Sequence, residues 1–222
     1  VVEPLYYSLK DELISKNIFE PIAIYEYYPC ISHDNKLYIF DKKYIYNNLE
    51  EAKNVPPLSE AIKVMEFPRQ KRKPFRCIAD FFANDRLDVV GFTLASAGLK
   101  ISDYEREFYD RGEFTKYYQV HGLGVELAEA LAEVLHKQIR LDWDIVPKEG
   151  HKLSDVQMKQ YVGCRYSPGY AACPELSQNR DIFDLLNPEK YGIELSETFQ
   201  MHPEQTTCAI VVHNKEANYY NV

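Results

Sequence analysis

Stretches typical of strands and stretches typical of helices follow one another in this chain without the regular alternation that builds a parallel sheet. Ile22–Tyr25 and Leu37–Phe40 lie on either side of the polar turn Ser32–Asn35, and their period and turn chemistry predict a hairpin. Asp88–Ala95 is a strongly apolar run that predicts a buried strand. Hairpins with interspersed helices and no βαβ rhythm predict an α+β fold, in which helices pack on a mainly antiparallel twisted sheet.

The longest predicted helix covers about residues 124–140. Its apolar stripe consists of Leu127, Leu131, Val134, Leu135 and Ile139. Shorter helices are expected from Pro4, from Ser102 with Glu105 as its capping-box partner, and over residues 155–160 and 181–186. Further strands are expected over residues 62–67, 197–201 and 206–213. No repeat, low-complexity tract or Gly/Ser linker divides the sequence, so we expect residues 1–222 to form a single domain.

Composition excludes several classes of protein. The 222 residues carry a net charge of -8, whereas a nucleic-acid-binding protein needs a basic surface. No apolar run approaches the roughly 18 residues of a membrane-spanning helix, and the first residues lack a signal-peptide pattern. The five cysteines include no close Cys-x-x-Cys pair, which predicts reduced thiols. We therefore expect a cytoplasmic protein that binds neither nucleic acid nor membrane.

One basic run, Arg69–Lys73, interrupts this acidic sequence just before Pro74. It is either a solvated, exposed loop or a docking patch for a partner. It is the strongest positive site in the sequence.

Known catalytic and metal-binding motifs are absent from the sequence. There is no GxGxxG, GxxxxGK, GxSxG or HExxH pattern. Cys164 and Cys173 are nine residues apart with no histidine nearby, and no other cysteine or histidine has the spacing of metal ligands. We expect no metal site and no catalytic triad or carboxylate pair.

The segment Gly163–Pro174 has the most unusual composition, because two prolines and two glycines surround Arg165. Such a segment predicts a rigid loop that displays a guanidinium group. A guanidinium suits a bidentate carboxylate or phosphate. The alternative is that Arg165 merely forms an ion pair with a nearby Asp or Glu.

This segment is similar to the Arg-x-x-Pro-Gly-Tyr-x-Ala-Cys-Pro signature of the activation domain of cobalamin-dependent methionine synthase. Other motifs of that family resemble stretches of this chain, in the same order: Arg69–Gln70, Ala79–Phe81, Val90–Phe92, Leu127–His136 with Arg140 and Trp143, Leu185–Leu186, Leu195–Pro203 and His213–Val222. The resemblance covers most of the chain and is firm from about residue 69 onwards.

The resemblance implies an S-adenosylmethionine-binding domain that supports the reductive methylation of cob(II)alamin to methylcobalamin. It makes the chain a component of a methyltransferase. The implied partners are a cobalamin-binding domain, which holds most of the cobalamin, and flavodoxin or a flavoprotein reductase as electron donor. The alternative is a non-catalytic module that binds S-adenosylmethionine or docks on a corrinoid protein to regulate another methyltransferase.

The resemblance also implies which residues bind the ligands. They are Arg165, Gly169, Tyr170, Ala171, Tyr219, Tyr220 and Glu129. Arg165 suits the methionine carboxylate, the two C-terminal tyrosines suit the adenosine, and Tyr170 is expected near the corrin face. Glu129 matches a helix carboxylate that favours the sulfonium and the α-ammonium group. Without a ligand role, Glu129 is an ordinary surface charge and the tyrosine pair consists of edge-strand aromatics.

The sequence departs from the family pattern at several positions. The family's Asp-Trp-Thr-Pro-Phe segment, which supplies an acidic ligand contact, is not found, and neither Asp11 nor Glu12 can be assigned to that role. Tyr166 stands where the signature has its first proline, and His202 where the family has tryptophan. These departures suit a shorter or stand-alone branch of the family.

Overall fold

The computed structural model describes residues 2–145 and 161–222 of the chain. Its helices are α1 (Val2–Ser15), α2 (Leu49–Ala52), α3 (Leu99–Asp110), α4 (Phe114–Asp142) and α6 (Gln178–Leu186). Its strands are β1 (Ile22–His33), β2 (Lys36–Ile39), β3 (Lys63–Glu66), β4 (Asp88–Ser96), β5 (Cys164–Tyr166), β6 (Glu194–Leu195), β7 (Met201–His202) and β8 (Thr206–Val212). Short 3-10 turns lie at Lys42–Tyr44, Leu58–Glu60, Ile78–Phe81 and Pro188–Tyr191.

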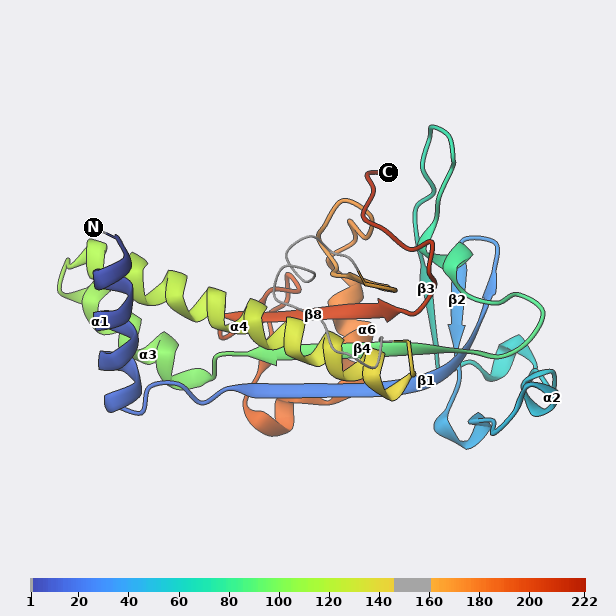
Figure 1. Ribbon diagram of the computed structural model, residues 1–222, viewed down its shortest axis with the longest axis horizontal. Coiled ribbons are helices and arrows are strands. Elements are labelled where there is room, and N and C mark those ends of the chain that lie inside the picture. Colours follow the sequence, from blue (N-terminus) through green and yellow to red (C-terminus); the bar gives the residue numbers. More distant parts are fainter. Residues whose placement is uncertain (1, 146–160) are drawn as a thin grey trace.

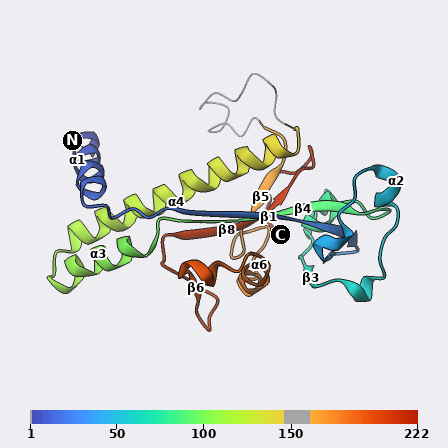
Figure 2. The same cartoon turned by 90° about the horizontal axis from the view of Figure 1, so that it is seen from below.

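Six strands form one antiparallel sheet in the order β3-β2-β1-β4-β8-β5. β1 is long enough to pair with β2 through Cys30–His33 and with β4 through Ile22–Cys30. β6 and β7 form a separate pair. Figure 2 shows α4 along one face of the sheet and α6 with β6 on the other. The predicted α+β fold with an antiparallel sheet is confirmed.

The central strand β4 is buried because both of its faces are covered. Val90, Phe92 and Leu94 belong to the main core, which also contains Ile182 and Phe183 of α6. The intervening residues are small where they meet α4, so that Ala95 packs with Ala132 and Leu135. Gly91 has a similar role: a Cβ placed there would lie 3.2 Å from the Trp143 ring. Alternation of large and small side chains along one strand therefore accommodates two layers of helices.

Helix α4 is longer than the sequence predicts, because it begins at Phe114 and passes through Gly122 and Gly124. A Cβ at Gly124 would lie only 2.6 Å from the Ile101 side chain and 2.8 Å from that of Gln205. The second glycine therefore permits close packing of α3 and of the segment before β8, and does not end the helix.

Helix α3 begins at Leu99, three residues before the predicted start at Ser102. Gly98 is the N-cap with φ of 93°, and the Ser102 hydroxyl lies within the helix, where it donates to Gln205 Oε1 at 3.0 Å. Glu105 binds His121 and Gln205. The predicted capping box is therefore wrong, because both of its side chains serve tertiary contacts.

Most of the other predicted elements are confirmed. The hairpin is β1–β2, and helices or strands are found at the predicted positions near Pro4 and over residues 62–67, 181–186 and 206–213. The strand predicted over residues 197–201 is wrong except at its last residue. Ser196 and Gln200 close a turn there, with Phe199 at a φ of 63°. The helix predicted over residues 155–160 lies outside the described residues.

Within the described residues, no helix is long and apolar enough to span a membrane. All five cysteines are buried free thiols.

Candidate functional site

The edge strand β5 leads into a tight bend over residues 167–174. Gly163 precedes the strand with φ of +92°, and a Cβ there would lie 2.5 Å from the Val212 carbonyl oxygen. Arg165 pairs with Val211 of β8. The bend is closed by hydrogen bonds from Gly169 N to Cys173 O at 2.8 Å and from Cys173 N to Tyr170 O at 2.9 Å. The backbone around Arg165 is thus fixed on both sides, as the sequence predicts.

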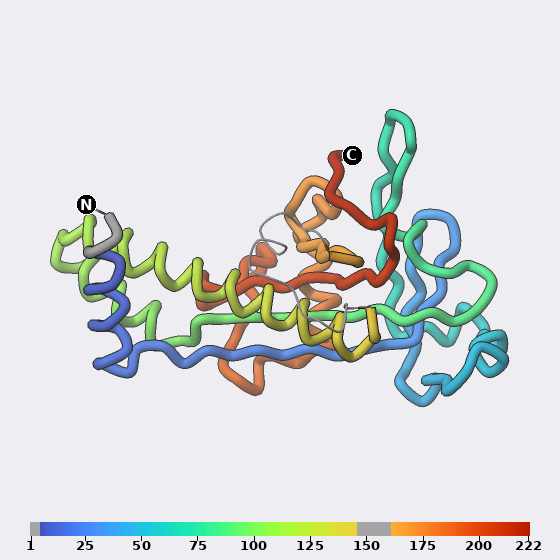
Figure 3. The backbone as a smooth tube through the Cα atoms, in the orientation of Figure 1, coloured from blue at the N-terminus to red at the C-terminus, as the bar shows by residue number. Residues whose placement is uncertain are grey.

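The C-terminal residues 213–222 return beside this bend (Figure 3). The Tyr166 hydroxyl donates to Asn218 O at 2.7 Å, and Arg76 Nη1 donates to Asn218 Oδ1 at 2.6 Å. Gln70 Nε2 donates to Asn221 O at 2.8 Å. The loop of residues 68–76 therefore supports the tail from the side opposite to the bend.

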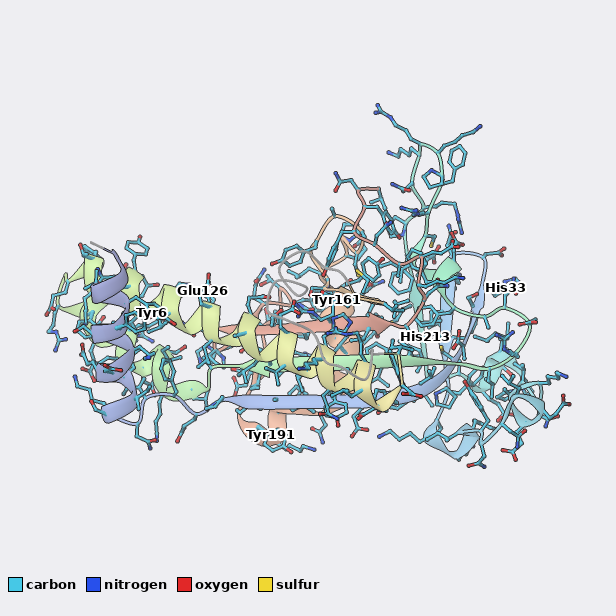
Figure 4. All side chains as sticks on the ribbon, viewed as in Figure 1. Tyr6, His33, Glu126, Tyr161, Tyr191 and His213 are labelled. Carbon is cyan, nitrogen blue, oxygen red and sulfur yellow. The ribbon has the colours of Figure 1, made fainter. Side chains whose placement is uncertain are left out.

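His213, labelled at the end of β8 in Figure 4, attaches the start of this tail to the sheet. Its Nε2 lies 2.7 Å from Asp88 Oδ1, and Trp143 of the α4 C-terminus packs edge-on against its ring. Burial alone would raise the pKa of Asp88, but His213 and the N–H groups of Ala83 and Val89 hold it below its usual value. The tail thus begins at a contact between His213 and the Asp88 carboxylate.

A cavity of about 510 Å³ opens between the bend, the tail and α4. It is lined by Glu129, Arg165, Tyr166, Ser167, Tyr170, Ala171, Ala172, Cys173, Tyr219, Tyr220 and Asn221. Six of the seven predicted ligand residues therefore lie around one cavity, and Gly169 shapes the bend without lining it. The volume lies within the range typical of small-molecule sites.

Sequence reasoning missed several of the lining residues. Ser167, Ala172, Cys173 and Asn221 lie within or beside the quoted motifs but carry no separate chemical signal. In the sequence, Tyr166 differs from the family pattern but gives no indication of a place in the site. The motif pointed to a segment that lines the cavity, whereas the identity of the wall residues depends on how the bend folds.

Arg165 is buried, forms an ion pair with α4 and lines the cavity. Nη2 donates to Glu133 Oε1 of α4 at 2.5 Å. Nε is buried and has no hydrogen-bond partner among the described residues. The internal ion pair considered above as an alternative is therefore present, and the side chain still lines the cavity.

The tyrosines form an aromatic wall. Tyr166 stacks on Phe81 with ring centroids 6.1 Å apart, and Tyr219 and Tyr220 meet Tyr166 edge-on at 6.0 and 6.1 Å. Burial raises the pKa of Tyr166, Tyr219 and Tyr220 above the usual value, so all three phenols are protonated at neutral pH. Tyr170 is 69% exposed at the rim of the cavity.

The one thiol of the wall is also unreactive. The Cys173 thiol donates to Gln178 Oε1 at 2.9 Å, and burial raises its pKa to about 12. Among the described residues, no group of three or more His, Cys, Asp or Glu side chains is placed to hold a metal ion. The cavity can bind and orient a ligand, but its side chains do not form an acid–base pair.

The sequence and the fold both resemble known proteins. Residues 7–222 match the family described as vitamin B12 dependent methionine synthase, activation domain. Methionine synthase of Mycobacterium tuberculosis is 36% identical over 226 residues, and that of Mycobacterium leprae is 36% identical over 213 residues. The aligned regions cover 96% and 90% of this chain, but only 18% and 17% of those proteins.

A crystal structure of the MetH reactivation domain bound to AdoHcy has a similar fold. The TM-score is 0.86 at 24% sequence identity, and the match covers 99% of this chain and 66% of that one. The chain thus has the fold of a reactivation domain and spans less than a fifth of the methionine synthases that it matches. It belongs to the family of activation domains of vitamin B12 dependent methionine synthase.

Proposed function

We propose that this chain binds S-adenosylmethionine in the cavity between the bend and the tail, and presents it for the reactivation of a cobalamin-dependent methionine synthase. In this proposal residues 1–222 act as a single activation domain. The observation that carries the proposal is the cavity itself, because it gathers Arg165, Glu129 and the tyrosine pair from three separate parts of the chain. The AdoHcy-bound relative supports this choice of ligand.

Opposite charges in the cavity fit the two ends of the donor's amino-acid group. Arg165 lines the cavity, and its guanidinium has N–H donors beyond the one that binds Glu133, which suits the methionine carboxylate. Glu129 lines the same cavity from α4 and supplies a negative charge for the α-ammonium group and the sulfonium. In the described residues neither Asp11 nor Glu12 lines the cavity, and Glu12 is bound to Lys116 and Tyr104, so α1 does not supply the family's missing acidic contact.

The nucleoside half would bind against Tyr219 and Tyr220 and the backbone of Ala171, where an aromatic face can stack on adenine. Tyr170 is exposed at the rim, which suits a contact with the corrin of a docked partner domain. Cobalamin, held mainly by that partner, supplies the nucleophile that accepts the methyl group. The role of this chain is to hold the donor in line and to keep water away.

The electron donor is proposed to be flavodoxin or a flavoprotein reductase that docks on the loop of residues 68–76. Arg69 is not available for docking, because its two Nη groups bind Asp80 at 2.6 Å each. Lys71, Arg72 and Lys73 are exposed at the tip of this loop, which projects away from the sheet in Figure 1. Exposed positive charge on an acidic chain favours an acidic partner.

The five buried free thiols support a reducing compartment, so we place the protein in the cytoplasm.

The proposal is tested by calorimetric titration of the chain with S-adenosylmethionine. The wild-type protein is expected to bind one equivalent, and Arg165→Ala to bind about 10- to 100-fold more weakly, because charged hydrogen bonds contribute about 1.5–3 kcal/mol. A second assay adds a cobalamin-binding domain and an electron donor and measures restored methionine synthesis. Binding without restored synthesis would favour the regulatory module, and absence of binding would refute the proposed function.

A further inference from the structure

The carboxylate of Glu133 lies directly behind the proposed ligand site. Its Oε1 accepts a hydrogen bond from Arg165 Nη2 at 2.5 Å. Glu133 follows Glu129 by one helical turn on α4, so both carboxylates are on the same side of the helix. Glu129 lines the cavity and Glu133 does not. Glu133 can therefore influence a ligand only through Arg165.

The surroundings of this ion pair carry additional positive charge. Arg140 is fully buried two turns further along α4, and its guanidinium lies 4.1 Å from the centre of the Tyr161 ring. It has no hydrogen-bond partner among the described residues. The intervening His136 is neutral, because burial together with Arg140 and Arg165 lowers its pKa to about 2. Within the described residues, Glu133 is thus ion-paired with Arg165, and Arg140 is a second buried guanidinium on the same helix as Glu133.

Arg165 has more hydrogen-bond donors than its ion pair with Glu133 uses. A guanidinium carries five N–H donors in a fixed fork, so it can bind one carboxylate with one edge and a second carboxylate with another. Nη2 binds Glu133, whereas Nε has no partner within the described residues. A second carboxylate can therefore bind the donors that Glu133 leaves unused.

We infer that Glu133 is a positioning residue, which holds the Arg165 guanidinium so that its free edge faces the carboxylate of the ligand. This inference rests on the proposed binding of S-adenosylmethionine and deepens it. Glu133 makes no contact with the ligand. Its loss would leave a buried guanidinium without its counterion, free to turn from the cavity or to draw in water.

The test compares two ligands on Glu133→Gln, which keeps the shape of the side chain and removes its charge. S-Adenosylhomocysteine has the amino-acid carboxylate, whereas 5′-methylthioadenosine has the same nucleoside without it. We expect about tenfold weaker binding of S-adenosylhomocysteine, because the ion pair that holds Arg165 becomes a hydrogen bond to an uncharged amide, and unchanged binding of 5′-methylthioadenosine. The matched control is Glu126→Gln, an exposed α4 residue labelled in Figure 4, with no ion pair among the described residues.

Each other outcome overturns the inference. Equal weakening for both ligands would show that Glu133 only supports the shape of the cavity. Tighter binding of S-adenosylhomocysteine would show that Glu133 competes with the ligand for Arg165. If Glu133→Gln binds both ligands as the wild type does, the positioning role is wrong while the proposed function stands. If the wild-type protein binds neither ligand, the proposed function itself fails.

Discussion

At the scale of single residues, the chain uses charged side chains mainly to join segments that are distant in sequence. Glu12 of α1 illustrates this. It accepts hydrogen bonds from Lys116 Nζ at 2.5 Å and from the Tyr104 hydroxyl at 2.6 Å, and so joins α1 to α4 and α3. The hydrogen bond from Lys116, followed by that from Tyr104, lowers the pKa of Glu12 to about 2. This shift predicts how stability depends on pH.

Glu12→Gln is expected to lower the free energy of unfolding by about 1 kcal/mol at pH 7, since the site is partly open to solvent. The folded pKa of the carboxyl lies below the unfolded one. Its contribution is therefore complete above pH 4.5 and is lost as the pH falls from about 4.5 to about 2. Urea unfolding measures the free energy of unfolding of both proteins. The difference between the wild type and Glu12→Gln should be smaller at pH 3 than at pH 7. Glu107→Gln, at an exposed α3 position, is the control, and a difference that is independent of pH would contradict the assignment.

At the scale of elements, two glycines in α4 have opposite environments. Gly122 is exposed, and a Cβ built there meets nothing within 4 Å. Gly124 is buried two residues later against Ile101 and Gln205. Because Gln205 also binds Glu105 and Ser102, it cannot move aside without losing those hydrogen bonds.

We therefore predict that Gly122→Ala raises the free energy of unfolding by about 0.5–1 kcal/mol, through its helix propensity alone. Gly124→Ala should lower it by about 1–3 kcal/mol, because the added methyl group overpacks the contact of α3 with α4. Denaturant unfolding of the two variants beside the wild type measures both changes. Equal effects of the same sign would mean that α4 does not pack on α3 as described.

The same helix shows where sequence reasoning succeeds and where it does not. The apolar stripe predicted the C-terminal half of α4. The first turns were not predicted, because glycine has a low helix propensity and the sequence does not show that tertiary packing outweighs it. Glu133 gave no signal, since an acidic residue on a helix has the same appearance whether it is solvated or holds a buried arginine. The strand predicted over residues 197–201 was wrong for a local reason. The Ser196 side chain closes a turn there, and the periodicity of apolar residues does not indicate such a turn.

At the scale of the whole molecule, the sheet brings the Arg165 bend, the C-terminal tail and the 68–76 loop to one side (Figure 3). The fold class followed from the order of the elements, whereas the candidate site residues were implied by the resemblance. The walls of the cavity could not be predicted, because they form only when three distant segments meet. The loop that carries the basic tip also supports the tail through Gln70 and Arg76, so the proposed docking surface lies next to the proposed ligand site.

Reversal of Lys71, Arg72 and Lys73 to glutamate should slow electron delivery by about tenfold at low salt, with a smaller difference at high salt. The readout is the rate of reactivation with a flavoprotein donor at two ionic strengths. Reversal of the exposed Lys43, Lys53 and Lys190 makes the same change in net charge elsewhere and is the control. If both triple variants behave alike, the tip is not the docking surface.

The central claim is that a methyl donor sits between a rigid bend and the chain's last residues, and a crystal structure of the chain with S-adenosylhomocysteine tests it most directly. We expect the amino-acid carboxylate to bind Arg165, Glu133 to remain bound to the guanidinium, and the nucleoside to lie against Tyr219 and Tyr220. A ligand bound elsewhere, or an Arg165 that contacts only Glu133 while the ligand occupies the cavity, would contradict it.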